Sequence, residues 1–257
     1  MGFQRLRWPE ACAALEEMNT FKADIEEIRR RALDKMEQGA VTAFYKADRE
    51  KVIEVLNEVL ATETLGAFVR IFLRAPGAKI SAGDKIQVFF PDVGTRTYSP
   101  YAADPSGRFE LAVFLHDRGP SSAWARGLRA GERVKLVGPQ GSLALAAIAG
   151  PLALFGDETS FGVARSLLAL RPDAQLRFET GAGCEPIVTA LELPAEALRP
   201  RGDLARIAKE LASLGGTLVL TGNARSIQTL RGHLKQLGST QLQRVKSYWA
   251  EGKTGLD

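Results

Sequence analysis

The feature that most constrains the fold of this 257-residue chain is a change in its apolar pattern near residue 150. Before it, from Phe68 onward, short strand-like runs follow closely on one another, separated by turns such as Pro76-Gly77 and Asp104-Pro-Ser-Gly107. Such spacing is typical of a small antiparallel barrel. After it, apolar runs alternate with helical segments, as in an α/β domain with a parallel sheet. The sequence therefore predicts two domains of different class.

In the second domain, the runs Pro151 to Phe155 and Thr217 to Thr221 are expected to be buried parallel strands, each entering a Gly-containing turn and then a helix. A domain of this kind binds ligands at the carboxyl ends of its strands. The expected boundaries are 1–46 for a helical N-terminal extension, 47–147 for the barrel, and 148–257 for the α/β domain with a C-terminal tail. Residues 51–60 fit either a helix or a first strand.

Composition narrows the class of partner only slightly. The formal net charge of +4 permits an anionic partner, such as a phosphate-bearing cofactor, without establishing one. We find no stripe of basic residues interleaved with aromatics, so nucleic acid is not expected. The two cysteines, Cys12 and Cys184, lack neighbours at metal-ligand spacing. No apolar stretch suits a bilayer or a secretory signal, so a cytoplasmic protein without membrane insertion or a metal site is expected.

The segment Arg96-Thr97-Tyr98-Ser99 follows a strand-like run and a turn, and is expected to lie on the next strand. Alternation along a strand places Arg96 and Tyr98 on one face, with Ser99 at its edge. A flavin requires such a set: a guanidinium for phosphate, an aromatic plane for the isoalloxazine, and a hydroxyl near the N5 atom that accepts hydride. Taken alone, the four residues also fit an ordinary strand with a surface Arg.

A second segment runs from His116 to Leu128 and contains Gly119-Pro120-Ser121-Ser122. Gly119-Pro120 is expected to close a strand, and Ser121 or Ser122 to cap a helix. Backbone amides exposed at that helix start form an anion site into which a pyrophosphate fits. A simple capped helix is the alternative interpretation.

Further motifs follow in a fixed order. After Arg96-x-Tyr98-Ser99 come a strand ending in His116, Gly119-Pro-Ser-Ser-x-Trp124, Gly138-Pro-Gln-Gly-Ser142, Gly156-Asp-Glu-Thr159 and Tyr248-Trp249-x-x-Gly252. This ordered set resembles the siderophore-interacting, or ferric-siderophore reductase, family of the ferredoxin-NADP reductase superfamily. The resemblance covers about residues 50–257 and leaves the N-terminal extension outside.

The resemblance implies a flavin-binding barrel followed by a nicotinamide-binding α/β domain, with FAD as cofactor. By motif position, Arg96 meets the flavin phosphates, Tyr98 stacks on the isoalloxazine, and Ser99 contacts its N5 edge, with Thr97 between them. The family commonly has Thr at the position of Ser99, and both residues carry the hydroxyl. The rest of the FAD is expected to lie against His116, Gly119, Pro120, Ser121 and Ser122. Trp124 either packs beside it or packs the helix.

The resemblance places the nicotinamide nucleotide at the turn Gly156-Asp157-Glu158-Thr159, after a buried strand. Two acidic residues are a poor electrostatic match to a phosphate, which leaves the ligand of this turn open. Gly222, in the turn after the later strand, is expected to close the nicotinamide pocket or to form a plain turn. Arg177 is available near the second strand for the 2′-phosphate of NADPH, but it does not decide between NADH and NADPH.

The implied function is an FAD-dependent reductase that passes electrons from NAD(P)H to a ferric siderophore or other ferric chelate. Lys246 and Lys253 in the tail are candidates for attracting the anionic chelate, or are simply solvated. No catalytic acid, base or nucleophile is expected, because the cofactor carries the chemistry. Two alternatives remain: a flavoprotein using ferredoxin or another protein redox partner, and a non-catalytic scaffold that retains the fold. FMN in place of FAD also stays open.

Overall fold

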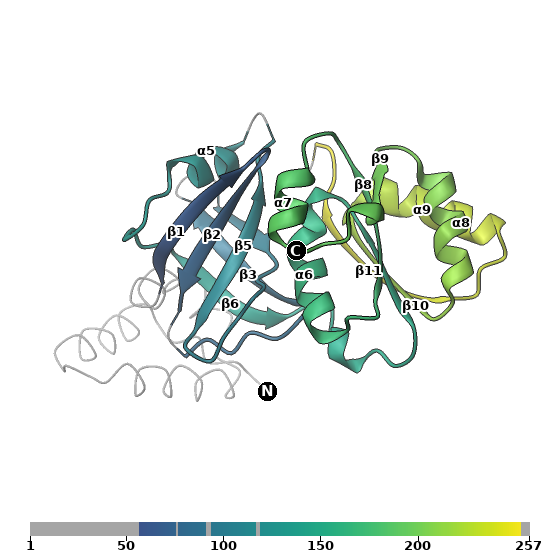
Figure 1. The fold of residues 1–257 in the computed structure, drawn as a ribbon, viewed down its shortest axis with the longest axis horizontal. Coiled ribbons are helices and arrows are strands. Elements are labelled where there is room, and N and C mark those ends of the chain that lie inside the picture. The colour runs from purple at the N-terminus through teal and green to yellow at the C-terminus, as the bar shows by residue number, and fades with distance from the viewer. Residues whose placement is uncertain (1–56, 76, 91–93, 117–118, 253–257) are drawn as a thin grey trace, which may run out of the picture. The chain divides into compact units, whose positions relative to one another are not determined.

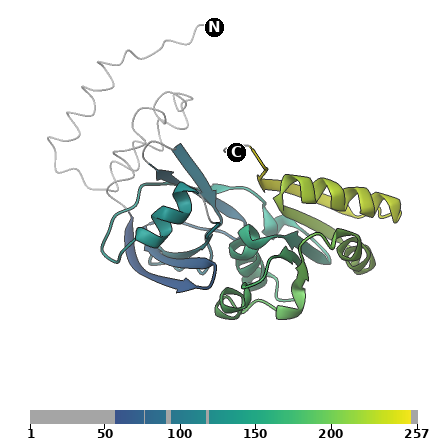
Figure 2. The same cartoon turned by 90° about the horizontal axis from the view of Figure 1, so that it is seen from above.

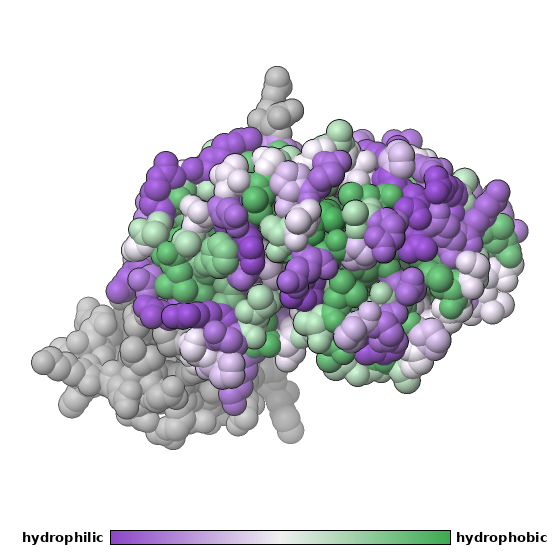
Figure 3. Space-filling view, in the orientation of Figure 1, coloured by the Kyte–Doolittle hydropathy of each residue, from purple (hydrophilic) through white to green (hydrophobic). Residues whose placement is uncertain are grey.

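The computed structural model of the protein describes residues 57–75, 77–90, 94–116 and 119–252 (Figure 1). The chain forms two compact units, 1–51 and 52–257. The first unit, which holds the predicted helical extension, lies outside the described residues, as does Lys253. No helix of the described part is long and apolar enough to cross a membrane. On the face shown in Figure 3, hydrophobic side chains are interrupted by hydrophilic ones.

Two three-stranded antiparallel sheets make up the predicted barrel. Their orders are β1-β2-β5 and β4-β3-β6. The strands are β1 (Glu58–Leu65), β2 (Phe68–Arg74), β3 (Asp84–Phe90), β4 (Gly94–Tyr98), β5 (Arg108–Phe114) and β6 (Leu136–Gly141), and helix α5 (Pro120–Gly127) follows β5. Alternate residues of β5 are buried, the pattern of a strand with one face on a core. Of the segment 51–60, residues 58–60 are strand, while 51–56 lie outside the description.

The second half is a five-stranded parallel sheet of order β11-β10-β7-β8-β9. Its strands are β7 (Leu152–Gly156), β8 (Gln175–Thr180), β9 (Leu198–Pro200), β10 (Thr217–Asn223) and β11 (Leu242–Trp249). The helices are α6 (Phe161–Leu170), α7 (Glu185–Ala190), α8 (Leu204–Leu214) and α9 (Ala224–Gln236), with short 3-10 turns η1 (Leu145–Ala147), η2 (Glu158–Ser160) and η3 (Ala195–Ala197). The two predicted parallel strands, β7 and β10, are neighbours at its centre.

The segment from Val245 onward was expected to be a tail, and that expectation is wrong for residues 245–249, which belong to β11. Among the described strands, β11 pairs only with β10 and lies at the edge of the sheet. An edge strand has a solvated side, so it accepts polar and charged residues and lacks the continuous apolar run of a central strand. The sequence LQRVKSYW therefore hides its strand character.

The parallel sheet is covered on both faces (Figure 1). Leu152 and Leu154 of β7 belong to a core with α6 and α7, whereas Ala153 and Phe155 belong to a core with α8 and α9. Alternation along β7 thus supplies both cores, as in a buried parallel strand. Figure 2 shows α9 lying along β10 and β11.

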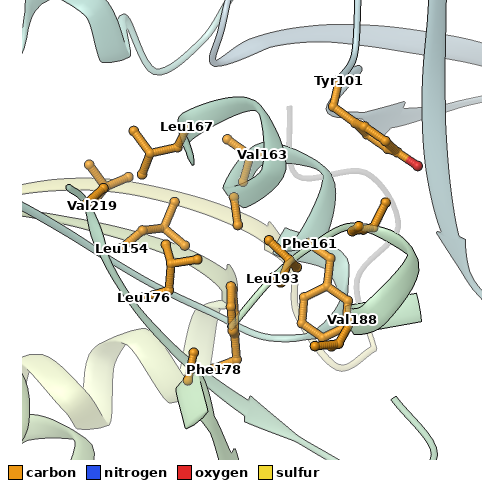
Figure 4. Packing of buried hydrophobic residues seen from close by; sticks show 14 of the residues in the cluster. Tyr101, Leu154, Phe161, Val163, Leu167, Leu176, Phe178, Val188, Leu193 and Val219 are labelled. Atoms are coloured by element: carbon orange, nitrogen blue, oxygen red, sulfur yellow. The ribbon is translucent and has the colours of Figure 1, made fainter. Parts of the chain in front are cut away.

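A chain of aromatic rings connects the barrel to the α/β domain. Phe161, at the start of α6, stacks on Phe68 of β2 with ring centroids 5.4 Å apart and meets Phe178 of β8 edge-on at 5.0 Å. Phe68 in turn lies 5.2 Å from Phe114 of β5. Tyr101 belongs to the same core, and Figure 4 shows it on the barrel side of the cluster. One continuous apolar core therefore spans both domains.

Arg177 does not extend toward the carboxyl edge of the sheet, where a nucleotide is expected. It lies in the middle of β8 and pairs with Glu210 of α8, which also receives Arg199 and Arg206. The suggestion that Arg177 is available for a 2′-phosphate is therefore not supported, because its guanidinium is held by a neighbouring carboxylate. Arg177 and Arg199 fasten α8 to β8 and β9 through Glu210, whereas Arg206 lies on α8 itself.

Replacing Phe161 with Ala tests the shared core. We expect Phe161→Ala to lower the free energy of unfolding by about 3–5 kcal/mol, because it leaves a cavity among buried aromatic rings. Urea unfolding followed by circular dichroism measures the change. Leu170→Ala, at the 40% exposed end of the same helix, is the matched control and should cost about 1 kcal/mol or less. Equal losses in the two variants would contradict the role given to Phe161.

Glu210 gives a prediction about pH. The hydrogen bond from Arg199 is the main cause that lowers its pKa from 4.5 to about 2. Since the folded-state pKa lies below the ordinary value, Glu210 stabilises the fold above pH 4.5, and this contribution is lost as pH falls toward 2. Glu210→Gln should lower the free energy of unfolding by about 1–2 kcal/mol at neutral pH and flatten its decline below pH 4.5.

Urea titrations at several pH values from neutral down to the acid limit of the fold measure this effect. Glu192→Gln is the control, because Glu192 pairs with Arg165 through a side chain that is 76% exposed. An unchanged pH dependence in Glu210→Gln would show that the arginine cluster adds no net stability.

Candidate functional site

The first predicted motif lies on β4, in register with β3. In this register Arg96 lies opposite Val88 and Tyr98 lies opposite Ile86. The side chains of Arg96 and Tyr98 are half-buried. The Tyr98 hydroxyl hydrogen-bonds Ser121 of α5. Burial raises the pKa of Tyr98 to about 12, opposed by the Ser121 hydrogen bond and the nearby Arg96 charge. The structure therefore brings the Arg96 to Ser99 segment together with the start of α5.

Helix α5 begins without a side-chain cap, which corrects the expectation that Ser121 or Ser122 caps it. The N-cap residue is Gly119, and no acidic residue lies in the first turn. The Ser122 hydroxyl donates instead to the carbonyl of His116 at 2.9 Å. The first turn of α5 therefore has no side-chain cap, and Ser121 and Ser122 are both buried.

The remaining residues of this segment pack closely. A Cβ at Gly119 would lie 2.9 Å from Cε1 of His116, so the glycine lets the imidazole lie against its backbone. The His116 ring is 6.2 Å from that of Phe114. Trp124 meets Phe90 edge-on at 5.1 Å, which shows that it packs α5 onto the barrel. The structure thus accounts for the packing role of Trp124.

Asp157, at the end of β7, has a buried carboxylate, 1% exposed, that is fully engaged by the protein. One oxygen accepts from the amide and hydroxyl of Thr159, and the other accepts from the Asn223 amide at 2.8 Å and the Trp249 indole at 2.7 Å. Burial raises its pKa, opposed by the hydrogen bonds from Thr159 and Trp249. Asp157 joins the carboxyl ends of β7, β10 and β11.

Glu158 is also buried and turned inward. Its carboxylate accepts from the Gly181 amide at 2.7 Å and forms an ion pair with Arg201. This arrangement connects the first turn after β7 to the segments that follow β8 and β9. The poor match between two acidic residues and a phosphate therefore has a structural explanation, since both carboxylates are held by protein groups.

The glycines of this edge allow close approach. A Cβ at Gly222, whose φ is +97°, would lie 2.6 Å from the carboxylate carbon of Asp157. A Cβ at Gly156 would lie 2.3 Å from the Cβ of Ser160. Ser160 of η2 and Thr221 of β10 hydrogen-bond each other at 2.9 Å, and Gly222, which was expected in the turn after this strand, lies within β10. The predicted residues Gly156 to Thr159 and Gly222 therefore form one cluster.

Ser99 lies where the barrel meets the α/β domain. Its hydroxyl is 3.3 Å from the hydroxyl of Tyr248, a partly buried residue of β11. A Cβ at Gly162 would lie 2.7 Å from the Ser99 carbonyl oxygen, so α6 packs directly on this backbone. The residue predicted at the N5 edge of a flavin thus contacts the first helix and the last strand of the second domain.

The predicted substrate residue Lys246 lies on β11 in register with Thr221 and is half-buried. It is two residues after Arg244 in the regular part of the strand, so alternation places the two on one face. Arg244 on that face donates to the carbonyls of Leu143 and Ala144. Lys246 therefore lies on the side of β11 that meets the barrel.

Sequence reasoning missed several residues that shape this site. Tyr248 and Trp249 were noted only as a motif, Ser160 and Gly162 received no role, and Asn223 was expected only in the turn with Gly222. Asn223 has a local signal, because an Asn directly before a helix is a favoured cap, and its side chain accepts from the amides of Arg225 and Ser226. Gly162 has no such signal, since its role depends on a segment distant in sequence.

Comparison with known proteins bears on the barrel and on the fold. A family model described as the siderophore-interacting FAD-binding domain matches residues 54–143. No curated protein sequence matches the chain.

Solved structures share the fold across both domains. A siderophore utilization protein from T. fusca is 22% identical, with a TM-score of 0.61, and the match covers 79% of this chain and 94% of that one. The siderophore-interacting protein SipS from Aeromonas hydrophila is 20% identical, with a TM-score of 0.60, covering 77% and 92%. Phthalate dioxygenase reductase is 16% identical, with a TM-score of 0.60, covering 77% and 69%.

These findings confirm the resemblance stated from the motifs. The antiparallel sheets followed by a five-stranded parallel sheet fit the order of an FAD-binding barrel and an α/β domain. Residues 54–143 match the siderophore-interacting FAD-binding domain, and the chain shares its two-domain fold with siderophore-interacting proteins and with ferredoxin-NADP reductase-like reductases.

Proposed function

We propose that the protein is an FAD-dependent reductase that transfers electrons from NAD(P)H to a ferric siderophore or other ferric chelate and releases ferrous iron. The observation that supports this most directly is the contact between Ser99 and Tyr248. It brings the end of the flavin motif against the sheet edge at which an α/β domain binds nucleotides. The residues proposed for the donor and for the flavin would thus adjoin.

The barrel residues fit an FAD. Arg96 supplies a guanidinium for phosphate, and the start of α5, which no side chain caps, is the proposed position of the pyrophosphate. Tyr98 supplies an aromatic plane and Ser99 a hydroxyl, with Thr97, His116, Gly119, Pro120 and Trp124 completing the proposed set. When bound, the flavin accepts hydride and releases single electrons. The protein's part is to hold and orient it.

For the nicotinamide nucleotide we propose the cluster of Gly156, Asp157, Glu158, Thr159 and Gly222. It lies at the carboxyl ends of β7 and β10, the two central strands of the sheet. Asp157 and Glu158 shape the turn from inside, because they accept hydrogen bonds from Thr159, Asn223 and Gly181. This structural use accounts for acidic residues in a proposed anion site.

For the acceptor we propose that Lys246, with Lys253, attracts an anionic ferric chelate. Lys246 lies on the barrel side of β11, near Tyr248. A chelated iron need not touch the protein for outer-sphere electron transfer from a reduced flavin, so a positive charge that raises the local concentration of the chelate suffices.

A protein redox partner is the second candidate. Its support is that both carboxylates of the Gly156 to Thr159 turn are consumed by internal contacts, which leaves no charged side chain of that turn for a nucleotide. The phthalate dioxygenase reductase, whose printed description is electron transfer from pyridine nucleotides to a [2Fe-2S] centre, shows the same fold. In this case ferredoxin or a similar protein exchanges electrons with the flavin.

Flavin binding is tested with purified protein. The visible spectrum should show bound flavin, or uptake of added FAD, and mass spectrometry identifies it as FAD or FMN. Arg96→Ala should weaken FAD binding by about ten- to a hundredfold, because it removes a charge-assisted contact to phosphate. Arg108→Ala, on an exposed position of β5, is the control. A colourless protein that takes up no FAD would support the scaffold alternative.

The donor and acceptor are tested by mixing the flavoprotein with NADH or NADPH in a stopped-flow instrument and then adding a ferric chelate in the presence of a ferrous-iron indicator. We expect at least one of the two nucleotides to bleach the flavin absorbance, and the ferric chelate then to reoxidise the flavin. Lys246→Gln should raise KM for an anionic chelate about two- to fivefold, with less effect at high salt. Lys235→Gln, exposed on α9, is the control. Bleaching only by reduced ferredoxin would favour the second candidate.

A further inference from the structure

We propose that Asp157 is a positioning residue: through the Trp249 indole it fixes the end of β11 so that Tyr248 is held against Ser99. This inference rests on the proposed function for its consequence, since Ser99 is the residue placed at the flavin edge. Its structural content is independent of any ligand. It assigns to Asp157 a role different from contacting the nucleotide.

The contacts of Asp157 favour this role. Four hydrogen bonds reach its buried carboxylate, two of them from Thr159 beside it and two from other strands. The Asn223 amide at the end of β10 and the Trp249 indole at the end of β11 share the same oxygen. A buried carboxylate is tolerated only when such donors compensate its desolvation, so the three strand ends are fixed together.

The register of β10 and β11 shows what this fixing does. Gly222 pairs with Ser247 and Asn223 pairs with Trp249, so Tyr248 is an extra residue of β11 without a partner in β10. A β-bulge of this kind redirects side chains and is common beside active sites. Asn223 and Trp249 are the register pair that follows the bulge on its C-terminal side. The same Asp157 oxygen accepts from the backbone amide of Asn223 and from the indole of Trp249.

Gly222 makes the arrangement possible. Its φ of +97° and the 2.6 Å approach of the Asp157 carboxylate carbon to a Cβ position exclude an ordinary side chain. The carboxylate can therefore lie directly over the last peptide groups of β10. Asp157, Gly222 and Trp249 thus form one unit, which we call the bulge clamp.

Through the bulge clamp, Asp157 sets the position of Tyr248. Trp249 turns back to Asp157, while the hydroxyl of Tyr248 lies 3.3 Å from that of Ser99. Hydride must arrive at the flavin edge that Ser99 is proposed to contact, so a displaced Tyr248 changes the geometry of that approach. Reactive geometry is sensitive to shifts of about 1 Å, which can cost on the order of a hundredfold in rate.

The test compares Asp157→Asn, Trp249→Phe and the double variant with wild type. An Asn side chain cannot accept from all four donors, and Phe keeps the aromatic bulk of Trp249 without the indole N–H. Asp173→Asn is the matched control, because Asp173 is 65% exposed and pairs with Arg171 between α6 and β8. If Asp157→Asn fails to fold, Trp249→Phe carries the test by itself.

The first readout needs no flavin. The chain has three tryptophans, so an ¹⁵N-labelled sample gives three indole N–H signals, and Trp249→Phe identifies one of them. We expect Asp157→Asn to shift that signal and speed its exchange with solvent, with no change in Asp173→Asn. An unshifted signal overturns the inference, as does protection of the Trp249 indole that is no greater than that of an exposed tryptophan in wild type.

The second readout uses the FAD-loaded protein. Asp157→Asn and Trp249→Phe should shift the visible flavin bands alike and lower the limiting rate of flavin reduction by about ten- to a hundredfold, while FAD affinity stays within about twofold. Because both act through one contact, the double variant should be no more than about twofold slower than the slower single variant. Additive losses in the double variant overturn the inference.

The two proposals fail in different ways. A wild-type flavin that no nicotinamide nucleotide reduces contradicts the proposed donor, and the indole signal and flavin bands still decide the role of Asp157. Full reduction by NADH or NADPH together with identical rates in wild type, Asp157→Asn and Trp249→Phe overturns the positioning role and leaves the proposed function intact.

Discussion

The candidate site depends on one buried carboxylate, that of Asp157. A charge in such a place is unfavourable unless hydrogen bonds replace its hydration, and here the donors come from the ends of β7, β10 and β11. The same hydrogen bonds therefore offset the lost hydration of the carboxylate and hold the strand ends together. Without them, the twist of the sheet would tend to separate these ends. The edge at which ligands are expected is thereby given a fixed shape.

Glu158 extends this principle to the other side of β7. It holds Gly181, after β8, and Arg201, after β9, so the two adjacent acidic residues share the work of fixing opposite halves of the sheet edge. The Glu158 charge is paired with Arg201, and the Asp157 carboxylate is hydrogen-bonded by neutral groups of the protein. An acidic sequence beside a proposed phosphate site is thus compatible with anion binding, because it is the compensated charge and not the formal residue type that a ligand meets.

The sequence predicts what local periodicity controls and misses what distant segments control. Strand alternation correctly placed Arg96 and Tyr98 together, and the apolar runs located β7 and β10. It did not show that Ser121 bonds Tyr98 rather than capping its helix, because a hydroxyl's choice of partner depends on tertiary neighbours. Strand β11 was missed because an edge strand has a solvent-exposed side, carries polar residues there, and so lacks a continuous apolar run.

The junction between the domains shows how two neighbouring residues divide a task. Phe161 stacks on Phe68 and binds the domains through apolar contact, whereas Gly162 has no side chain and lets the Ser99 carbonyl approach α6. The large side chain of Phe161 and the missing side chain of Gly162 together bring the barrel and the parallel sheet into contact at Ser99. Transfer between two bound cofactors requires such fixed proximity, so the packing of this junction is part of the site.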